Sequence, residues 1–383
     1  MPWRETTKMD IRVRLVKKWN SKMYGISELA EEFGVSRPTV YKWTQRSLGN
    51  GEEWMVDRAS VPKSCPHRTP EELGKRIIEA KEAHADWGPA KLITMLRRDE
   101  PGIEWPAAST AGRILAQAGL VKKRRTYRRG TVSPYASYLE ADESGEMMTV
   151  DHKGQIRMLN GAYCYPVTIA DPVSRYIYAV DGKTSTSGAE AKQSFIRVFK
   201  EYGLPERIGS DNGNPFACTR SLGGLSRLSV WWIELGILPV KIHKGCPWEN
   251  GIHERMHRTL KAATARPPAA TLRKQQRKFD VFRSEFNNVR PHEGLDDRRP
   301  SDRLKSCKRS YPRRVDPVEY PAHYETRSVR RKGEMTWMGR HIFVGQSFTG
   351  KRLGLVEIDD GIWAVHFSTI EIGRFDERKG KIL

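Results

Sequence analysis

The chain has 383 residues, which is too long for one compact core and predicts about two to four domains. Hydrophobic residues make up 38% of it, enough to exclude wholesale disorder. The 67 Lys and Arg residues outnumber the 46 Asp and Glu residues, leaving a net charge of +21, so nucleic acid is the first candidate partner and an anionic membrane surface the second. No apolar run is long enough to span a bilayer, and the first residues hold no apolar signal region, which disfavours the membrane.

The cysteines are scattered and odd in number, and no two of them form a Cys-x-x-Cys pair. This pattern predicts neither a disulfide framework nor a zinc knuckle, and it fits a reducing cytosol best. The five residues are Cys65, Cys164, Cys218, Cys246 and Cys307.

A helix-turn-helix pattern occupies residues 10–46. Apolar residues recur at helical spacing, and an amphipathic stretch over 26–33, with Ser27 expected as its N-cap, leads into a tight glycine turn. Ser36 then caps a further helix that has proline in its first turn. An ordinary three-helix bundle is the alternative, which the positive charge disfavours. The predicted helix would present these groove-facing side chains: Arg37, Thr39, Lys42 and Gln45.

Residues 69–121 predict a second helical block, which begins at a run resembling a capping box over 69–72. Two further helices are expected over 89–98 and 106–118. The block is either a second helix-turn-helix or a purely structural bundle, and the pattern does not decide between them.

The stretch over 122–144 is predicted to be a basic linker. Charge runs of this kind are usually only solvated, but this one joins two modules, so we expect an arm that follows DNA phosphates without reading their sequence. Its cationic residues are Lys122, Lys123, Arg124, Arg125, Arg128 and Arg129.

From residue 145 to 303 the pattern becomes that of an α/β core. An Asn160-Gly161 pair marks a hairpin turn, and Asp171-Pro172 marks another. Three strands in a meander, followed by a helix, a strand and further helices, is the order of an RNase H-like core. The expected elements are strands over 148–156, 163–170 and 175–180, a helix over 187–202 and a strand over 206–209.

Two aspartates of this core are candidates for metal binding. Asp151 falls within the first strand and Asp211 just after the fourth, so the two are expected to converge. Transfer of a phosphodiester to water or to a 3′-hydroxyl needs an activated attacking oxygen and a neutralised leaving oxygen. Two divalent ions about 3.5–4 Å apart supply both when converging carboxylates hold them, and Mg²⁺ suits such oxygen ligands.

A later helix over 247–261 is expected to supply the third carboxylate. At about 100° per residue, Arg258 and Lys261 lie within about 40° of Glu254, so one carboxylate and two cations share a face. Glu249 lies about 140° from Glu254 and cannot serve the same site. Glu254 is therefore the predicted metal ligand, with Arg258 and Lys261 beside it as contacts to phosphates.

Several motifs resemble the integrase-core transposases of bacterial insertion sequences. They are Val-Asp-His-Lys-Gly over 150–154, Ser-Asp-Asn-Gly over 210–213, Trp-Glu-Asn-Gly-Ile-His-Glu-Arg over 248–255, and Phe-Asn-Asn-Val-Arg-Pro-His-Glu-Gly-Leu over 286–295 with Arg299-Pro300. The stretch 225–232 resembles the IS481 group, and the resemblance covers roughly residues 1–302. The 42 residues between Asp211 and Glu254 exceed the retroviral spacing, and the insertion, over 218–229, has an uncertain role.

The resemblance implies a transposase with an Asp-Asp-Glu site on Asp151, Asp211 and Glu254. Such an enzyme would bind the terminal inverted repeats of its element, nick DNA by hydrolysis and transfer the 3′-hydroxyl into target DNA. It would use two Mg²⁺ ions, with Mn²⁺ as a substitute, and act as a homodimer or higher oligomer on DNA in the bacterial cytoplasm, associated with the nucleoid. The alternatives are a helix-turn-helix regulator with an inactive core and a simple RNase H-type hydrolase.

Other polar residues of the core receive structural interpretations. Asp171, before a proline, is expected to close a turn rather than bind metal. Trp231 and Trp232 are expected in the core or in an interface. The segment 290–292 either contacts DNA or ends a helix. Four histidines are interpreted as packing or phosphate contacts without metal-ligand spacing: His152, His243, His253 and His257.

Short strands punctuated by glycine predict a small β-barrel over 318–383 that binds nucleic acid or protein. The predicted fold is thus multidomain. It has all-α helix-turn-helix modules over 1–49 and 69–121, a basic linker over 122–144, an α/β RNase H-like core over 145–303 and this barrel.

Overall fold

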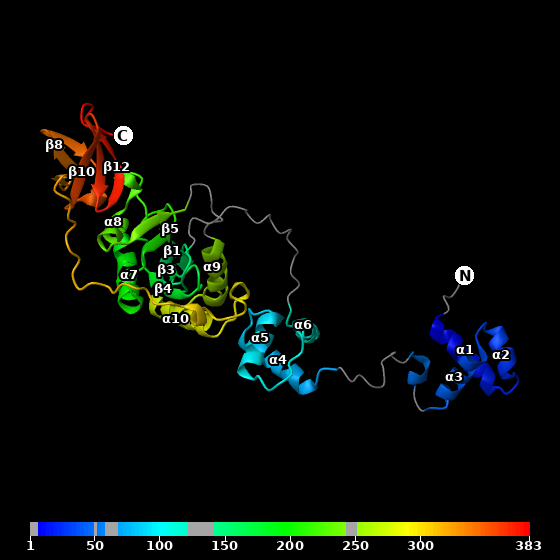
Figure 1. The fold of residues 1–383 in the computed structure, drawn as a ribbon. Coiled ribbons are helices and arrows are strands. Elements are labelled where there is room, and N and C mark those ends of the chain that lie inside the picture. Colours follow the sequence, from blue (N-terminus) through cyan, green and yellow to red (C-terminus); the bar gives the residue numbers. More distant parts are fainter. Residues whose placement is uncertain (1–6, 50–51, 58–67, 122–140, 243–250) are drawn as a thin grey trace. The chain divides into compact units, whose positions relative to one another are not determined.

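The computed structural model describes residues 7–49, 52–57, 68–121, 141–242 and 251–383. The basic residues expected over 122–129, together with His243 and Glu249, lie outside this part of the chain. The chain divides into two compact units, Met1–Arg68 and Thr69–Leu383, each drawn in Figure 1. None of the helices in the described ranges combines the length and apolarity needed to cross a bilayer.

The first unit is a three-helix bundle followed by a short 3₁₀ turn. Gly34, at φ 61°, provides the tight turn before the third helix, and Ser36 is the N-cap of that helix, as predicted. Ser27 is not a cap: it lies inside the second helix, whose N-cap Gly25 donates its N–H to Glu28 Oε2 at 2.7 Å. The elements are α1 (Lys8–Asn20), α2 (Ile26–Glu32), α3 (Arg37–Ser47) and η1 (Glu52–Met55).

The second unit begins with three helices that share a core of their own. Ile77, Leu92 and Leu115 are fully buried there, between Trp87 and Trp105. The helices are α4 (Glu71–Ala83), α5 (Pro89–Asp99) and α6 (Ala108–Gln117).

A six-stranded sheet forms the centre of the second unit. β1 pairs antiparallel with β3 and parallel with β5, and β5 pairs parallel with β6. The strand order is β2-β3-β1-β5-β6, with β4 on the other side of β3, so an antiparallel meander continues into parallel strands as expected for an RNase H-like core. The strands are β1 (Met147–His152), β2 (Ile156–Arg157), β3 (Tyr163–Ala170), β4 (Ile177–Lys183), β5 (Arg207–Ser210) and β6 (Leu238–Lys241).

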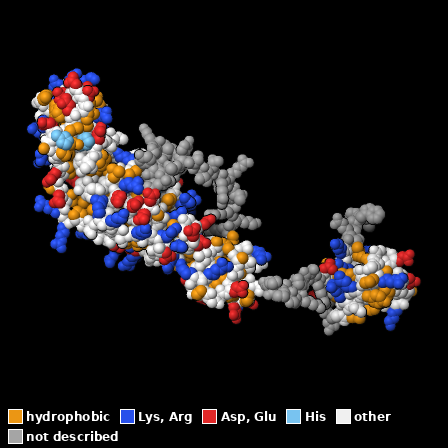
Figure 2. Space-filling model, viewed as in Figure 1, with side chains coloured by type: hydrophobic (Ala, Val, Ile, Leu, Met, Phe, Trp, Pro, Cys, Tyr) orange, Lys and Arg blue, Asp and Glu red, His pale blue; other side chains and the backbone are white. Residues whose placement is uncertain are grey.

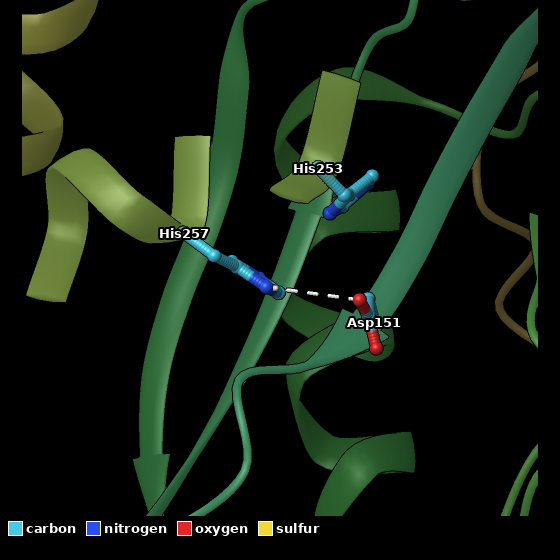
Figure 3. Close-up of side chains that lie close together, drawn as sticks. All are labelled: Asp151, His253 and His257. Atoms are coloured by element: carbon cyan, nitrogen blue, oxygen red, sulfur yellow. Dashed lines mark ion pairs between the residues drawn. The ribbon is translucent and has the colours of Figure 1, made fainter. Parts of the chain in front are cut away.

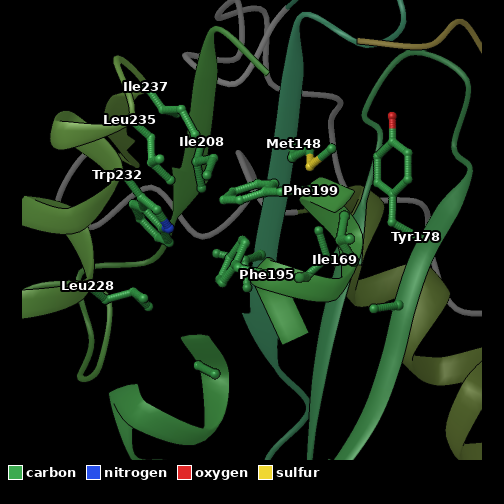
Figure 4. Packing of buried hydrophobic residues seen from close by; sticks show 14 of the residues in the cluster. Met148, Ile169, Tyr178, Phe195, Phe199, Ile208, Leu228, Trp232, Leu235 and Ile237 are labelled. Atoms are coloured by element: carbon green, nitrogen blue, oxygen red, sulfur yellow. The ribbon is translucent and has the colours of Figure 1, made fainter. Parts of the chain in front are cut away.

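Helices cover both faces of this sheet (Figure 1). On one face, α7 (Gly188–Tyr202) and α8 (Arg227–Glu234) pack through aromatic side chains such as Phe195 and Trp232 (Figure 4). On the other, α9 (Gly251–Thr264) and α10 (Leu272–Asn288) bury Met256, Leu260 and Phe279 against the strands. Trp231 and Trp232 both lie in the core, as expected.

Short strands do occupy the region over 318–383 where the sequence predicted a barrel, but they do not close into one hydrogen-bonded barrel. An antiparallel sheet in the order β13-β12-β11-β10-β7 remains open, and β8 with β9 forms a separate hairpin. The result is a half-barrel. Its strands are β7 (Glu325–Ser328), β8 (Glu334–Trp337), β9 (Arg340–Phe343), β10 (Arg352–Asp359), β11 (Ile362–Phe367), β12 (Ile370–Asp376) and β13 (Lys381–Ile382).

The insertion between Asp211 and Glu254 packs against this half-barrel. Leu222, in the short turn η2 (Leu222–Gly224), donates its backbone N–H to Val344 O at 2.9 Å, and the hydroxyls of Ser221 and Ser347 are 2.9 Å apart. Residues of α8 also join the hydrophobic cluster of the C-terminal strands. The insertion, whose role the sequence left open, is therefore a docking surface for the last module.

Candidate active site

Asp151 lies near the end of β1, and Asp211 directly follows β5, the adjacent parallel strand. Val150 of β1 is in register with Ser210 of β5, so the next residue in each strand is an aspartate. Adjacent strands lie about 4.8 Å apart, and residues in register project to the same face of a sheet. The register therefore brings residues 151 and 211 next to each other at the carboxyl end of the sheet, and both side chains are half-buried.

The backbone after β5 orients the second of these carboxylates. Gly213 donates its N–H to Asp211 Oδ1 at 3.2 Å. A Cβ at position 213 would lie 2.9 Å from Asp211 Oδ2, so a larger residue there would require the carboxylate to shift. The Ser-Asp-Asn-Gly motif thus holds the carboxylate through its last residue.

Two histidines of α9 reach the strands beside Asp151 (Figure 3). His253 Nε2 lies 2.6 Å from the Thr149 hydroxyl, and His257 Nε2 lies 2.7 Å from the Thr168 hydroxyl. Thr168 is the residue opposite Asp151 on β3. These contacts hold α9 over the site.

The hydroxyl contacts also determine which ring nitrogen of His257 carries the proton. Thr168 donates its hydroxyl to the Asp151 carbonyl at 3.0 Å, so its oxygen must accept a proton from His257 Nε2. Burial lowers the pKa of His257 to about 2 and keeps the ring neutral. His257 Nδ1 therefore faces Asp151 Oδ2 with a lone pair, at 3.7 Å (Figure 3).

This arrangement corrects the interpretation that the histidines lack metal-ligand spacing. His253 and His257 are four residues apart on one helix face, and with Asp151 they offer ligand atoms that all lie within 4.8 Å of one another. The separation of 3.7 Å between Nδ1 and Oδ2 lets both atoms reach one cation at ordinary ligand distances of about 2.0–2.2 Å. The spacing i, i+4 was the signal that could have identified the pair from sequence.

The donor set fits a divalent cation. Two carboxylates side by side are the hard oxygen ligands that Mg²⁺ prefers, and an imidazole nitrogen beside them is tolerated better by Mn²⁺ and later transition metals. His152 adds a further polar group: its ring stacks on Phe216 at 5.4 Å, and neither nitrogen has a hydrogen-bond partner within the described residues.

The exposed side of α9 carries the third predicted carboxylate. Glu254, Arg258 and Lys261 are all exposed, while His253 and His257 are buried against the strands. Glu254 directly follows His253, so its backbone lies near β1. These three exposed residues form a stripe along α9, next to the face that is buried against the strands.

Asp171 lies apart from these groups. Its fully buried carboxylate accepts N–H groups from Gly145 at 2.8 Å, Val173 at 2.9 Å and Ser174 at 2.6 Å. It closes the turn between β3 and β4, as the sequence predicted.

In the first unit, the predicted groove-facing residues lie on α3. Arg37, Lys42 and Gln45 are exposed, and a surface hollow runs past Lys42 and Gln45. Thr39 is half-buried, and its hydroxyl lies 2.9 Å from that of Ser36, which makes it part of the helix cap. Figure 2 shows Lys and Arg side chains among acidic ones on the visible face of each unit.

Three family models match separate segments of the chain. A helix-turn-helix domain matches residues 11–62, an integrase core domain matches 235–300, and the C-terminal domain of IS481 family transposases matches 324–383. The integrase core match includes α9 and the residues of the predicted motifs after it.

Similar proteins include retroviral polyproteins. The Gag-Pol polyprotein of avian reticuloendotheliosis virus is 28% identical over 200 residues, which are 51% of this chain and 16% of that protein. That of gibbon ape leukemia virus is 25% identical over 203 residues, or 52% of this chain and 11% of that protein. The chain thus matches only a small part of each polyprotein. Among solved structures, the HTLV-2 integrase catalytic core domain in complex with magnesium has a TM-score of 0.34 and 14% identity, covering 43% of this chain and all of that one.

The order of the three family matches follows the order of the structural modules. With a helix-turn-helix domain first, an integrase core domain next and an IS481 transposase C-terminal domain last, the chain matches an IS481-like transposase with an integrase-like core.

Proposed function

We propose that this chain is a DNA transposase that nicks the ends of an insertion sequence by hydrolysis and joins the resulting 3′-hydroxyls to target DNA. The observation that supports the proposal is the register of β1 with β5, in which Val150 pairs with Ser210, so that Asp151 and Asp211 are the next residue on each chain segment. Such an enzyme would work on the nucleoid in a bacterial cytoplasm.

In this proposal Asp151, Asp211 and Glu254 would hold two Mg²⁺ ions, and these would supply charge neutralisation for the attacking and leaving oxygens. The Gly213 N–H orients Asp211, and His257 Nδ1 faces Asp151 from the α9 side, where it could share a cation with that carboxylate. Because a ring nitrogen also faces this site, we expect Mn²⁺ to replace Mg²⁺ readily.

Recognition of the terminal inverted repeats is assigned to the first unit, through the exposed side chains of α3. The phosphates near the reacting bond would contact Arg258 and Lys261, which share the exposed stripe of α9 with Glu254. The basic residues over 122–129 would follow the backbone between these sites. Two ends must be processed together, so a homodimer or higher oligomer is expected on DNA.

The test is cleavage and joining of terminal-repeat DNA by the full chain with Mg²⁺. Asp211→Asn is expected to abolish nicking and strand joining together and to leave binding of the repeat within about twofold, because one site serves both steps. Asp151→Asn and Glu254→Gln should behave alike, whereas Glu249→Gln is the matched control that stays active. Sequence-specific binding by the unmodified chain without any metal-dependent cleavage would instead indicate a regulator with an inactive core.

A further inference from the structure

Three cations from distant parts of the chain meet where the second helical block contacts the core. Lys91 is on α5, Arg175 is in the turn between β3 and β4, and Arg290 follows α10. The contact itself is direct: Arg98 of α5 donates to Val289 O at 3.3 Å, and His84 Nδ1 lies 3.0 Å from Glu285 Oε1.

The loop over 290–298 brings these cations together. Arg290 lies over the Phe286 ring at 5.8 Å, and His292 meets the edge of the same ring at 4.5 Å. The guanidinium of Arg175 packs against Gly294 so closely that any Cβ there would overlap it. The charges of Lys91, Arg175 and Arg290 all act on His292, whose pKa burial and these cations lower to about 3.

None of the three cations forms a direct ion pair in the described residues, although acidic residues lie near enough to act electrostatically on Lys91 and Arg290. The side chains of Lys91, Arg175 and Arg290 are half-buried, and none forms a hydrogen bond or an ion pair there. Arg290 Nε is buried without a partner. Two acids, Glu285 and Asp86, act electrostatically on Arg290, and Glu285 is already engaged by His84.

Such a cluster is unfavourable in the free protein. Burial lowers the pKa of Lys91 to about 8; Arg290 and Arg175 also lower it, whereas Asp297 and Glu293 raise it. Burial also lowers the pKa of Arg175 and of Arg290. Buried charges are normally paired, so the cluster lacks the group that would compensate it.

The backbone around the cluster is strained as well. Arg175 has φ 60°, and Asp296 and Asp297 have φ 55° and 59° in the facing loop. Residues other than glycine rarely adopt the left-handed region, and strain of this kind concentrates at ligand-binding sites.

We propose that Lys91, Arg175 and Arg290 form a phosphate-binding site between the second helical block and the catalytic core. Two guanidinium forks and one ammonium suit a tetrahedral dianion or a phosphodiester, because arginine pairs with phosphate oxygens bidentately and lysine binds as a point charge. The phosphate comes either from DNA or from solution. Only the DNA source rests on the proposed function. Arg255 of α9, which follows Glu254, acts electrostatically on Arg175 and links the site to the helix of the active site.

The first experiment measures melting of the full chain with inorganic phosphate or with chloride at equal ionic strength. Phosphate is expected to raise the melting temperature of the unmodified protein. Lys91→Met, Arg175→Met and Arg290→Met should lose most of this rise, and Arg277→Met, which changes an exposed cation of α10, should keep it. A rise that is the same in all four variants would overturn the proposal.

The second experiment identifies the source of the phosphate. Binding of random duplex DNA is measured against salt concentration for the same variants. If DNA supplies the phosphate, each of the three cluster variants lowers the salt slope by about one unit relative to the unmodified protein. If the slopes stay unchanged while the response to phosphate is lost, the site takes a free phosphate. A chain that lacks strand-transfer activity but shows the phosphate response refutes the proposed function and leaves this site intact.

Discussion

Replacing Lys91 by methionine should stabilise the protein at neutral pH, which is unusual for a half-buried side chain. Methionine keeps the length of the lysine stem and removes its charge from the neighbourhood of Arg175 and Arg290. The folded-state pKa of Lys91 is about 8, below its ordinary value of 10.5. The charged form therefore opposes folding at every pH below the folded-state pKa, and the penalty disappears as pH rises towards 10.5.

The size of the effect follows from this shift. At about 1.4 kcal/mol per pKa unit, moving the pKa from 10.5 to about 8 corresponds to a full penalty of about 3 kcal/mol. Solvent still reaches part of the ammonium group, which reduces the expected value to about 1–2 kcal/mol. The Lys91→Met variant should thus melt a few degrees above the unmodified protein at pH 7, at about 2–4 °C per kcal/mol.

The assay is the difference in melting temperature between the variant and the unmodified protein, measured from pH 7 to pH 10 in chloride. The difference should shrink between pH 8 and pH 10 as Lys91 becomes neutral in the folded protein. Lys75→Met is the control, because Lys75 is 69% exposed and should show no such trend. A Lys91→Met variant that is less stable than the unmodified protein at pH 7 would refute the reasoning.

Three further predictions concern the core and its neighbours. Gly213→Ala should reduce strand transfer, but less than loss of the Asp211 carboxylate, with little change in melting temperature, because the new Cβ would shift that carboxylate; activity equal to that of the unmodified enzyme would contradict the close approach. Arg258→Ala and Lys261→Ala should each lower the salt slope of DNA binding by about one unit and leave the melting temperature nearly unchanged, whereas a stability loss with an unaltered slope would indicate structural roles. Leu222→Ala should cost about 1–3 kcal/mol in thermal or denaturant unfolding by loosening the contact with the half-barrel, and an unchanged transition would exclude a stabilising role.

The adjacency of the two aspartates could be predicted because it depends on local patterns. Asp151 lies near the end of one short apolar strand and Asp211 directly after another, and β3 matches its predicted bounds of 163–170, so the order of elements leads to the sheet. The α9 histidines were missed for a physical reason. Their partners, Thr149 and Thr168, lie about a hundred residues earlier in the chain, and only the packing of α9 on the strands brings them into contact.

Strand positions in the last module were also predictable, since glycine turns separate them. Whether the strands close into a barrel could not be predicted. Hydrogen-bond pairing between strands depends on non-local geometry, which the alternation of apolar and polar residues along a strand does not encode. The same limit applies to the cation cluster. Lys91 and Arg290 are far apart in sequence, and no spacing rule relates residues on α5 to a loop after α10.

The contact between the insertion and the half-barrel has a consequence for exchanging modules between related chains. Leu225, Val230 and Ile233 belong to the chain segment of the catalytic domain, yet they complete the hydrophobic cluster of the C-terminal strands. Truncation of the chain before residue 318 would expose these side chains to water. A half-barrel taken from another chain would have to pack against a surface that is complementary to the original half-barrel. The segment 218–234 and the last module therefore form one packing unit. A functional chimera would have to take both from the same parent chain.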